Sequence, residues 1–267
     1  MHFDSHPCEI KTKLFHLHTN NCCNTRAECC RTEICRRSNF ALSIIVKRFF
    51  AEISSDSGAI LTLHCPNTGS LKNCLIESSP CLYSLSSNKN RKLSGTLEFV
   101  TTRFGNLAGI NSSAANKIVA SALNAKVIQS LRDYDTFLKE VKFGEENSRL
   151  DFRLQSSKNL LPDCFLEVKS ATYDIGNGII LFPDSVTSRG AKHLRELTSA
   201  VEKGYRAVLF FCVQVSNSKM LKIADNIDPY YADTLAKAVT AGVEIEIWNS
   251  KLSGDEVTLK DQIEFSY

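Results

Sequence analysis

The spacing of hydrophobic residues changes twice along this chain of 267 residues. Residues 1–40 have no regular apolar spacing, so they offer no continuous face to bury, and we interpret them as a variable or disordered leader. Residues 41–110 contain short β-like runs, such as 59–64 and 96–102, between clusters of turn-forming residues. Because several short strands need to close on one another, this segment predicts a small β-barrel or meander.

Residues 111–267 combine helical and strand patterns. After a capping residue at Asn111 or Ser112, apolar residues recur at helical spacing up to Leu123. The same criteria predict further helices and strands, the helices at 187–204 and 227–241 and the strands at 150–154, 161–169, 205–215 and 243–248. This order is typical of an α/β domain with a mixed sheet. We therefore expect a two-domain α+β chain that divides near residue 110.

Composition and charge exclude some classes of protein. Hydrophobic residues make up 43% and charged residues 23%, which excludes a collagen-like or wholly disordered chain. The net charge of +3 is too small to indicate nucleic-acid binding, so any basic footprint has to be local. No apolar run approaches the roughly 18 residues of a membrane-spanning helix, and the first residues lack the pattern of a secretory signal. We expect a soluble intracellular protein, cytoplasmic or organellar, that is not secreted and has no membrane partner; an oligomer is compatible with the sequence.

The eleven cysteines do not indicate a disulfide framework, because their number is odd and they crowd unevenly toward the N-terminal part. A reducing compartment fits this distribution better. Several His and Cys residues could be zinc ligands, but matched C-x-x-C pairs are absent, so we predict no zinc site. These candidates are His16, His18, Cys22, Cys23, Cys29, Cys30 and Cys35 in the leader, and His64, Cys65 and Cys74 after it.

An aspartate strand followed by an E-x-K strand carries the most chemical information. Glu167 and Lys169 point to the same side of their strand, because side chains alternate. If the strand of Asp151 pairs beside this one, a strand spacing of about 4.8 Å brings Asp151 and Glu167 to a common cation. Asp163 would lie about 13 Å from Glu167 along the strand, so it is excluded. Glu140 is a weaker candidate for a further acid.

A divalent cation on Asp151 and Glu167, Mg²⁺ or Mn²⁺, could lower the pKa of a bound water and stabilise charge on a phosphoryl oxygen. Lys169 could orient or deprotonate that water, or stabilise the transition state. Phosphodiester hydrolysis uses all these groups. The alternative is that Glu167 and Lys169 form an ordinary ion pair on a solvated strand.

Several cations could contact a nucleic-acid backbone, although each could equally belong to a solvated surface. Those on the helix after the E-x-K strand are Arg189, Lys192, His193 and Arg195, and those in the β-rich segment are Lys47, Arg48, Lys89, Arg91 and Lys92.

Five blocks of sequence in the same order resemble the sugar fermentation stimulation protein A (SfsA) family over about residues 41 to 250. They are Leu61–Gly69 (LTLHCPNTG), Glu140–Gly144 (EVKFG), Ser148–Phe152 (SRLDF), Glu167–Lys169 (EVK) and Phe182–Leu197 (FPDSVTSRGAKHLREL).

The resemblance implies an N-terminal OB-like β-barrel, residues 41–110, and a C-terminal nuclease-like domain of the PD-(D/E)XK type, residues 111–267. It also implies non-sequence-specific DNA binding and a regulatory role in sugar metabolism. Carried over by motif, Asp151, Glu167 and Lys169 take the nuclease-core positions, with Glu140 as a further acid and His193 on the following helix with Lys192.

Three hypotheses follow. The first is a DNA-binding protein with a Mg²⁺-dependent endonuclease or exonuclease centre. The second is a non-catalytic DNA-binding regulatory protein linked to sugar metabolism, because a fold does not dictate activity. The third, a carbohydrate-binding barrel, has little support, since the only tryptophan, Trp248, lies outside the barrel segment.

Overall fold

The computed structural model describes residues 40–47, 49–55, 57–88, 90–146, 148–157, 161–253 and 256–267. The predicted leader lies outside the described residues, apart from its last residue. So do two predicted DNA contacts, Arg48 and Lys89, and nothing is described of the side chain of Lys47.

The N-terminal part is a six-stranded sheet in the order β1-β2-β3-β5-β4, with β6 paired to β5. The strands are β1 (Phe40–Lys47), β2 (Phe50–Ser55), β3 (Ile60–His64), β4 (Cys81–Leu85), β5 (Gly95–Thr101) and β6 (Leu107–Gly109). Alternate residues such as Ala51, Ile53 and Leu63 are fully buried and form its core. A bridge between Ala41 and Pro80 lies where the two end strands approach each other. The predicted β-rich segment is confirmed, and a closed barrel stays a prediction.

The C-terminal part contains a six-stranded mixed sheet in the order β15-β14-β12-β9-β8-β7. These strands are β7 (Thr136–Phe143), β8 (Ser148–Gln155), β9 (Cys164–Ala171), β12 (Arg206–Val213), β14 (Glu244–Leu252) and β15 (Val257–Gln262). The central strands β9, β12 and β14 run parallel, and the outer pairings are antiparallel. A smaller sheet contains β10 (Tyr173–Asp174), β11 (Ile179–Phe182), β13 (Met220–Ile223) and β16 (Glu264–Ser266). The mixed sheet expected from the sequence is confirmed.

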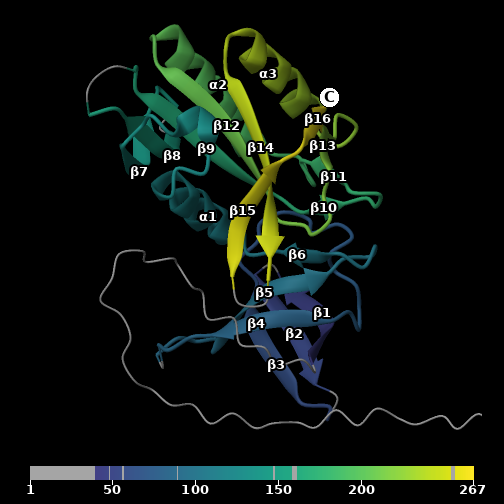
Figure 1. Cartoon of the computed structure of the whole chain (residues 1–267). Helices are drawn as coiled ribbons and strands as arrows, with labels where there is room; N and C mark the ends of the chain where they lie inside the picture. Colours follow the sequence, from purple (N-terminus) through teal and green to yellow (C-terminus); the bar gives the residue numbers. More distant parts are fainter. Residues whose placement is uncertain are drawn as a thin grey trace, which may run out of the picture.

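Helices cover both faces of the large sheet (Figure 1). The helical elements are α1 (Ser112–Asn124), the short 3-10 helix η1 (Gln129–Leu131), α2 (Ser188–Glu202) and α3 (Pro229–Thr240). Along β12, Phe210 packs in the cluster that contains α1, whereas Phe211 packs in the cluster that contains α2 and α3. This follows from the alternation of side chains along a strand that is buried on both faces. The expected cap at Thr187 is confirmed, because its side chain accepts a hydrogen bond from the N–H of Gly190.

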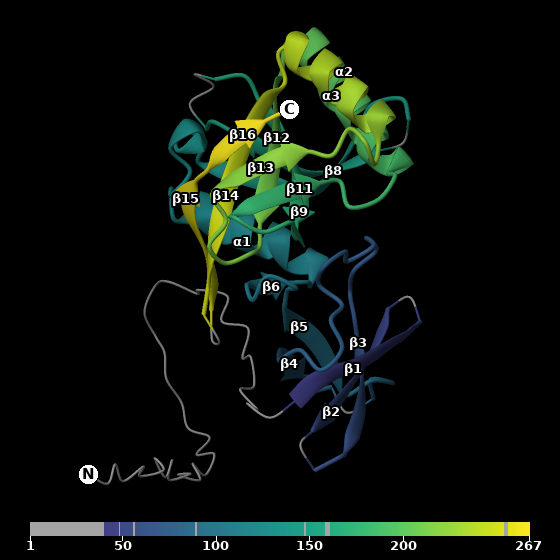
Figure 2. The same cartoon turned by 90° about the vertical axis from the view of Figure 1, so that its right-hand side faces the viewer.

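The N-terminal sheet lies directly against the C-terminal part (Figure 2). Backbone pairing and apolar contacts join the two. The N–H of Gly109 donates to the carbonyl of Gln214, and the N–H of Ser216 donates to the carbonyl of Leu107, each over 2.8 Å. One apolar cluster continues from the core of the N-terminal sheet into the core beneath α2. The two parts therefore pack against each other through backbone hydrogen bonds and a shared apolar core. No helix in the described part of the chain is long and apolar enough to cross a membrane.

Candidate active site

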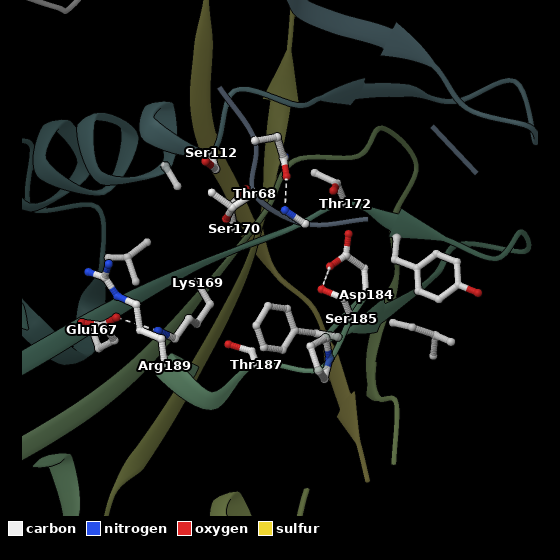
Figure 3. A pocket seen from close by; sticks show the side chains of 18 of the residues that line it. Thr68, Ser112, Glu167, Lys169, Ser170, Thr172, Asp184, Ser185, Thr187 and Arg189 are labelled. Carbon is white, nitrogen blue, oxygen red and sulfur yellow. Dashed lines mark hydrogen bonds and ion pairs between the residues drawn. The ribbon is translucent and has the colours of Figure 1, made fainter. Parts of the chain in front are cut away.

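A cleft of about 580 Å³ lies where the large sheet, α1 and α2 meet the N-terminal sheet (Figure 3). Its wall comes from β9, the start of α1, the segment Leu181–Arg189 and the loop Asn67–Gly69. Asp151, Glu167, Lys169 and Arg189, which the sequence analysis selected, all line it. The cleft therefore contains the predicted acidic and basic groups together.

Asp151 reaches β9 because β8 and β9 separate at this point. Their pairing extends only from Leu154 to Phe152, so the N–H of Val168 has no ladder partner on β8. The carboxylate of Asp151 takes that place: Oδ2 accepts from the N–H of Val168 (2.8 Å), and Oδ1 accepts from Nδ2 of Asn116 on α1 (2.7 Å). These bonds fix the carboxylate beside β9.

The side-chain alternation of β8 changes at the same residue. Leu150 packs in the cluster beneath α2, whereas Phe152 packs in the cluster beneath α1. On β7 the register places Glu140 across from Asp151, and Glu140 has a positive φ of 54°. A left-handed backbone conformation is uncommon for glutamate and marks a local twist of the strand pair. Asp151 thus lies where the strand turns over rather than on a regular polar face.

Glu167 is almost fully buried, with 3% of its surface exposed. Its Oε1 accepts from Nζ of Lys169 (2.6 Å) and is hydrogen-bonded to Nδ1 of His193 on α2. Its Oε2 is buried and has no hydrogen-bond partner among the described residues. A buried carboxylate oxygen without a partner costs free energy unless another group, such as a cation, supplies the missing interaction.

His193 lies behind Glu167, where it holds the carboxylate. Nε of Arg189 donates to Nε2 of His193 (3.4 Å), and Nδ1 of His193 also lies 3.3 Å from Nζ of Lys169. We assign the ring proton to Nδ1, which donates to Glu167, because the ionised carboxylate can only accept. The ammonium of Lys169 and the Nδ1–H of His193 then converge on the same oxygen, and Oε2 is left for another ligand.

Burial and the negative charge of Glu167 raise the pKa of Asp151 to about 7. Burial acts in the same direction on Glu167, but the charge of Lys169 and the hydrogen bond from His193 outweigh it and lower its pKa to about 2. Two neighbouring carboxylates, of which one disfavours the ionisation of the other and has an unpaired oxygen, fit a hard divalent cation. No group of three His, Cys, Asp or Glu side chains that could hold a metal is found among the described residues. A cation would therefore take these two carboxylates and keep several waters, as Mg²⁺ commonly does.

Other selected residues are not in this cleft. Glu140 is exposed on β7 and does not line the cleft, and Lys192 is half-buried on α2. Arg195 is exposed but forms an ion pair with Glu146 (2.7 Å). Arg91 donates to Oγ1 of Thr96 (3.0 Å), and Lys92 is exposed.

His193 requires a correction. We predicted it as a nucleic-acid contact, yet only 4% of its surface is exposed, so it cannot reach a DNA backbone directly. The sequence carried the signal: Gly190, His193, Leu194 and Leu197 have i, i+3, i+4, i+7 spacing, and all four are buried on one face of α2. Asp163, which we excluded, forms an ion pair with Arg153 (2.5 Å).

Sequence reasoning also missed residues of the loop Asn67–Gly69 and of α1. Asp184 lines the cleft and contacts the residues that follow this loop, because its Oδ2 accepts from the N–H of Leu71 (2.9 Å). A Cβ on Gly69 would lie only 2.5 Å from that carboxylate, so a larger residue requires the Asp184 side chain to shift. The loop Asn67–Gly69 lies in the block Leu61–Gly69 and Asp184 lies in the block Phe182–Leu197, so both were detectable as motifs. Asn116 had no such signal, because its contact with Asp151 spans 35 residues of chain.

Family models match both parts of the chain. The SfsA N-terminal OB domain matches residues 46–110, and the sugar fermentation stimulation protein RE domain matches residues 113–256. The chain belongs to the SfsA family. The resemblance noted in the sequence is thereby confirmed, and the SfsA models assign an OB domain to the N-terminal sheet.

Curated SfsA relatives cover most of the chain. A sugar fermentation stimulation protein homolog of Saccharophagus degradans is 44% identical over 216 residues, which is 80% of this chain and 91% of that protein. One from Pseudomonas savastanoi pv. phaseolicola is 44% identical over 224 residues, covering 84% of this chain and 93% of the homolog. The solved structure of Pyrococcus furiosus SfsA in complex with Ca²⁺ has the same fold, with a TM-score of 0.77 and 23% identity over 89% of this chain and 99% of that one.

Proposed function

We propose that this protein binds DNA without sequence specificity and hydrolyses phosphodiester bonds with a divalent cation, Mg²⁺ or Mn²⁺, on Asp151 and Glu167. The observation that carries the proposal is the unpartnered, buried Oε2 of Glu167 in a cleft that also contains the carboxylate of Asp151 and the ammonium of Lys169. Neither a simple ion pair nor a solvated strand accounts for that oxygen.

Two further observations support the cation. Burial and the charge of Glu167 raise the pKa of Asp151 to about 7, and a cation bound to both carboxylates would favour the ionised form of Asp151. The P. furiosus SfsA structure contains Ca²⁺, a hard cation that takes oxygen ligands as Mg²⁺ does. We extend this property to the present chain as part of the proposal.

The side chains have separate roles in the proposed reaction. Asn116 and the N–H of Val168 hold Asp151, while His193 holds Glu167. When bound, the cation supplies Lewis-acid stabilisation of the phosphoryl oxygen and lowers the pKa of an attacking water.

Lys169 and Arg189 act on the substrate. Lys169, whose side chain is 13% exposed, orients that water or stabilises the charge that develops on the phosphate. Arg189, exposed at the cleft, binds a neighbouring phosphate oxygen.

The proposal is tested with full-length protein and labelled single-stranded, duplex and branched DNA in Mg²⁺, in Mn²⁺ and with chelator. We expect cation-dependent cleavage, with a loss of about 10²–10³-fold in Glu167→Gln and in Lys169→Met, as for removal of a preorganised charge at a reacting phosphate. Glu264→Gln, an exposed glutamate on β16, is the matched control and should cleave normally.

Thermal unfolding of each variant separates loss of chemistry from loss of fold. If the wild type cleaves none of these substrates in either metal, the hydrolytic proposal is wrong. DNA binding that persists in chelator and weakens steeply with salt would then identify a non-catalytic regulatory protein.

A further inference from the structure

The cleft has two chemically different ends (Figure 3). One end is charged and contains Glu167, Lys169 and Arg189. The other end is rich in hydroxyl groups, which belong to Thr68, Ser112, Ser170, Thr172 and Ser185. The two ends therefore suit different parts of one ligand.

The hydroxyl-rich end does not suit a phosphate, because the carboxylate of Asp184 lies there and would repel it. Tyr173 and Phe182 add aromatic surface to the same cleft. Neutral hydrogen-bonding groups beside aromatic surface fit a nucleoside, whose base offers donors and acceptors and a face for stacking.

The wall at this end is held rigidly. Oγ of Ser70 donates to the carbonyl of Asp184 (2.7 Å), next to the bond from the N–H of Leu71. Nδ2 of Asn67 donates to the carbonyl of Ile110 (2.7 Å), and Oγ of Ser112 donates to the carbonyl of Pro66 (2.9 Å). The loop Asn67–Gly69 is thus hydrogen-bonded through its neighbours to the start of α1 and to the segment that precedes α2.

The size of the cleft is that of a small-molecule pocket. Its 580 Å³ lies within the range of about 300–1,000 Å³ that encloses single small ligands. From Glu167 to its last residue, Ala171, β9 advances about 13 Å at the rise of an extended strand. A nucleoside within a duplex is stacked and paired, so it can enter a pocket of this kind only from single-stranded DNA or after extrusion from the duplex.

We propose that the cleft takes a single-stranded segment of DNA, with the scissile phosphate at the charged end and the adjoining nucleoside against the OB-domain loop Asn67–Gly69. The inference rests on the proposed function for its reaction and goes beyond it by naming the form of the substrate. In this arrangement the OB domain forms part of the substrate pocket of the RE domain.

Thr68→Trp tests the inference. Thr68 is exposed in the cleft, so the indole would fill the nucleoside end without displacing a buried group. The probes are a short fluorescent oligonucleotide and the same sequence as a blunt duplex. Binding is measured in Ca²⁺ and cleavage in Mg²⁺.

We expect the wild type to bind and cleave the single strand better than the duplex. Thr68→Trp should weaken single-strand binding about tenfold or more, with little change in calorimetric Ca²⁺ binding. Ile60→Trp, at an exposed position of β3 outside the cleft, should change neither property. Thr68→Phe, a smaller obstruction, serves if the tryptophan variant does not fold.

Equal or better binding and cleavage of the duplex, or unchanged single-strand affinity in a folded Thr68 variant, would overturn the inference. The two proposals fail separately. Rapid duplex cleavage would leave the hydrolytic function intact and remove the single-strand preference. Tight single-strand binding that depends on Thr68, without any cleavage, would support the single-strand preference and contradict the hydrolytic function.

Discussion

At the scale of single residues, the orientation of Glu167 depends on a buried histidine. His193 shares the Oε1 atom of Glu167 with Lys169, while its own Nε2 accepts from Arg189. Arg189 is exposed at the cleft and His193 is buried, so this series of contacts connects the cleft surface to the carboxylate. Partners that orient a metal ligand commonly contribute 10–100-fold to metal affinity, about as much as a weak ligand does.

The first prediction at this scale compares two amides at position 193. In His193→Asn, the amide nitrogen can replace Nδ1 and still donate to Glu167. In His193→Gln, the amide extends toward the position of Nε2. We expect calorimetric Mn²⁺ or Ca²⁺ affinity to stay close to the wild-type value in the asparagine variant and to fall about 10–100-fold in the glutamine variant. The same affinity in both variants would contradict the assigned tautomer.

At the scale of elements, two loops form one wall of the cleft through Gly69 and Asp184. The glycine allows the carboxylate to approach, and the carboxylate in turn accepts the N–H of Leu71. The arrangement needs both members, because a methyl group at position 69 would overlap the carboxylate oxygens. The contact is local in space, although 115 residues of chain separate its members.

The corresponding prediction is a double-mutant cycle. Gly69→Ala should push the carboxylate off the N–H of Leu71 and lower the free energy of unfolding by about 1.5–3 kcal/mol, the value of a hydrogen bond to a charged group. In the Asp184→Ala background the same change should cost little, because the obstructing carboxylate is gone. Urea unfolding of the four proteins measures the coupling. Strictly additive effects would show that the contact is not the reason for the glycine.

These residues show which parts of the site can be predicted from the periodicity of the sequence. Periodicity predicted that Glu167 and Lys169 share a face of β9, and the structure brings them within 2.6 Å. The same helical periodicity would have predicted a buried His193, had it been applied to this polar residue together with Leu194 and Leu197. The position of Asp151 beside β9 was harder to predict from the sequence, because β8 has to separate from β9 and change the face of its side chains at that residue. Neither the separation of the strands nor the change of face can be predicted from the spacing of apolar residues.

At the scale of the whole molecule, the two domains act as one body. The carboxylate of Asp174, with none of its surface exposed, accepts from Oγ1 of Thr102 (2.7 Å) and Nδ2 of Asn106 (2.8 Å) of the N-terminal part. It also accepts from the N–H of Gly176 (2.8 Å). With the apolar cluster that spans the domains, these bonds join the two parts of the chain that line the cleft.

Asp174→Asn tests this coupling. The amide nitrogen of the asparagine is itself a donor, so it cannot accept from the donors that bind the carboxylate. We expect a loss of several kcal/mol in the free energy of unfolding, about 1.5–3 kcal/mol for each charged hydrogen bond that is broken. Calorimetry should still show one cooperative transition, at a lower temperature, for the coupled domains. Asp225→Asn, at an exposed site, is the control and should have little effect. Two separate transitions in the wild type would show that the domains are not coupled.

The sequence by itself determined the features that depend on neighbouring residues: the strand that carries Glu167 and Lys169, the cap of α2 at Thr187 and the alternation of strands and helices. These follow from local backbone geometry, which repeats every two or every 3.6 residues. Only the tertiary structure decided that Asp151, Asn116 and the loop Asn67–Gly69 meet at one cleft, with His193 buried behind Glu167. They come from separate elements, and their meeting depends on how the apolar faces of those elements pack together, which no single segment specifies.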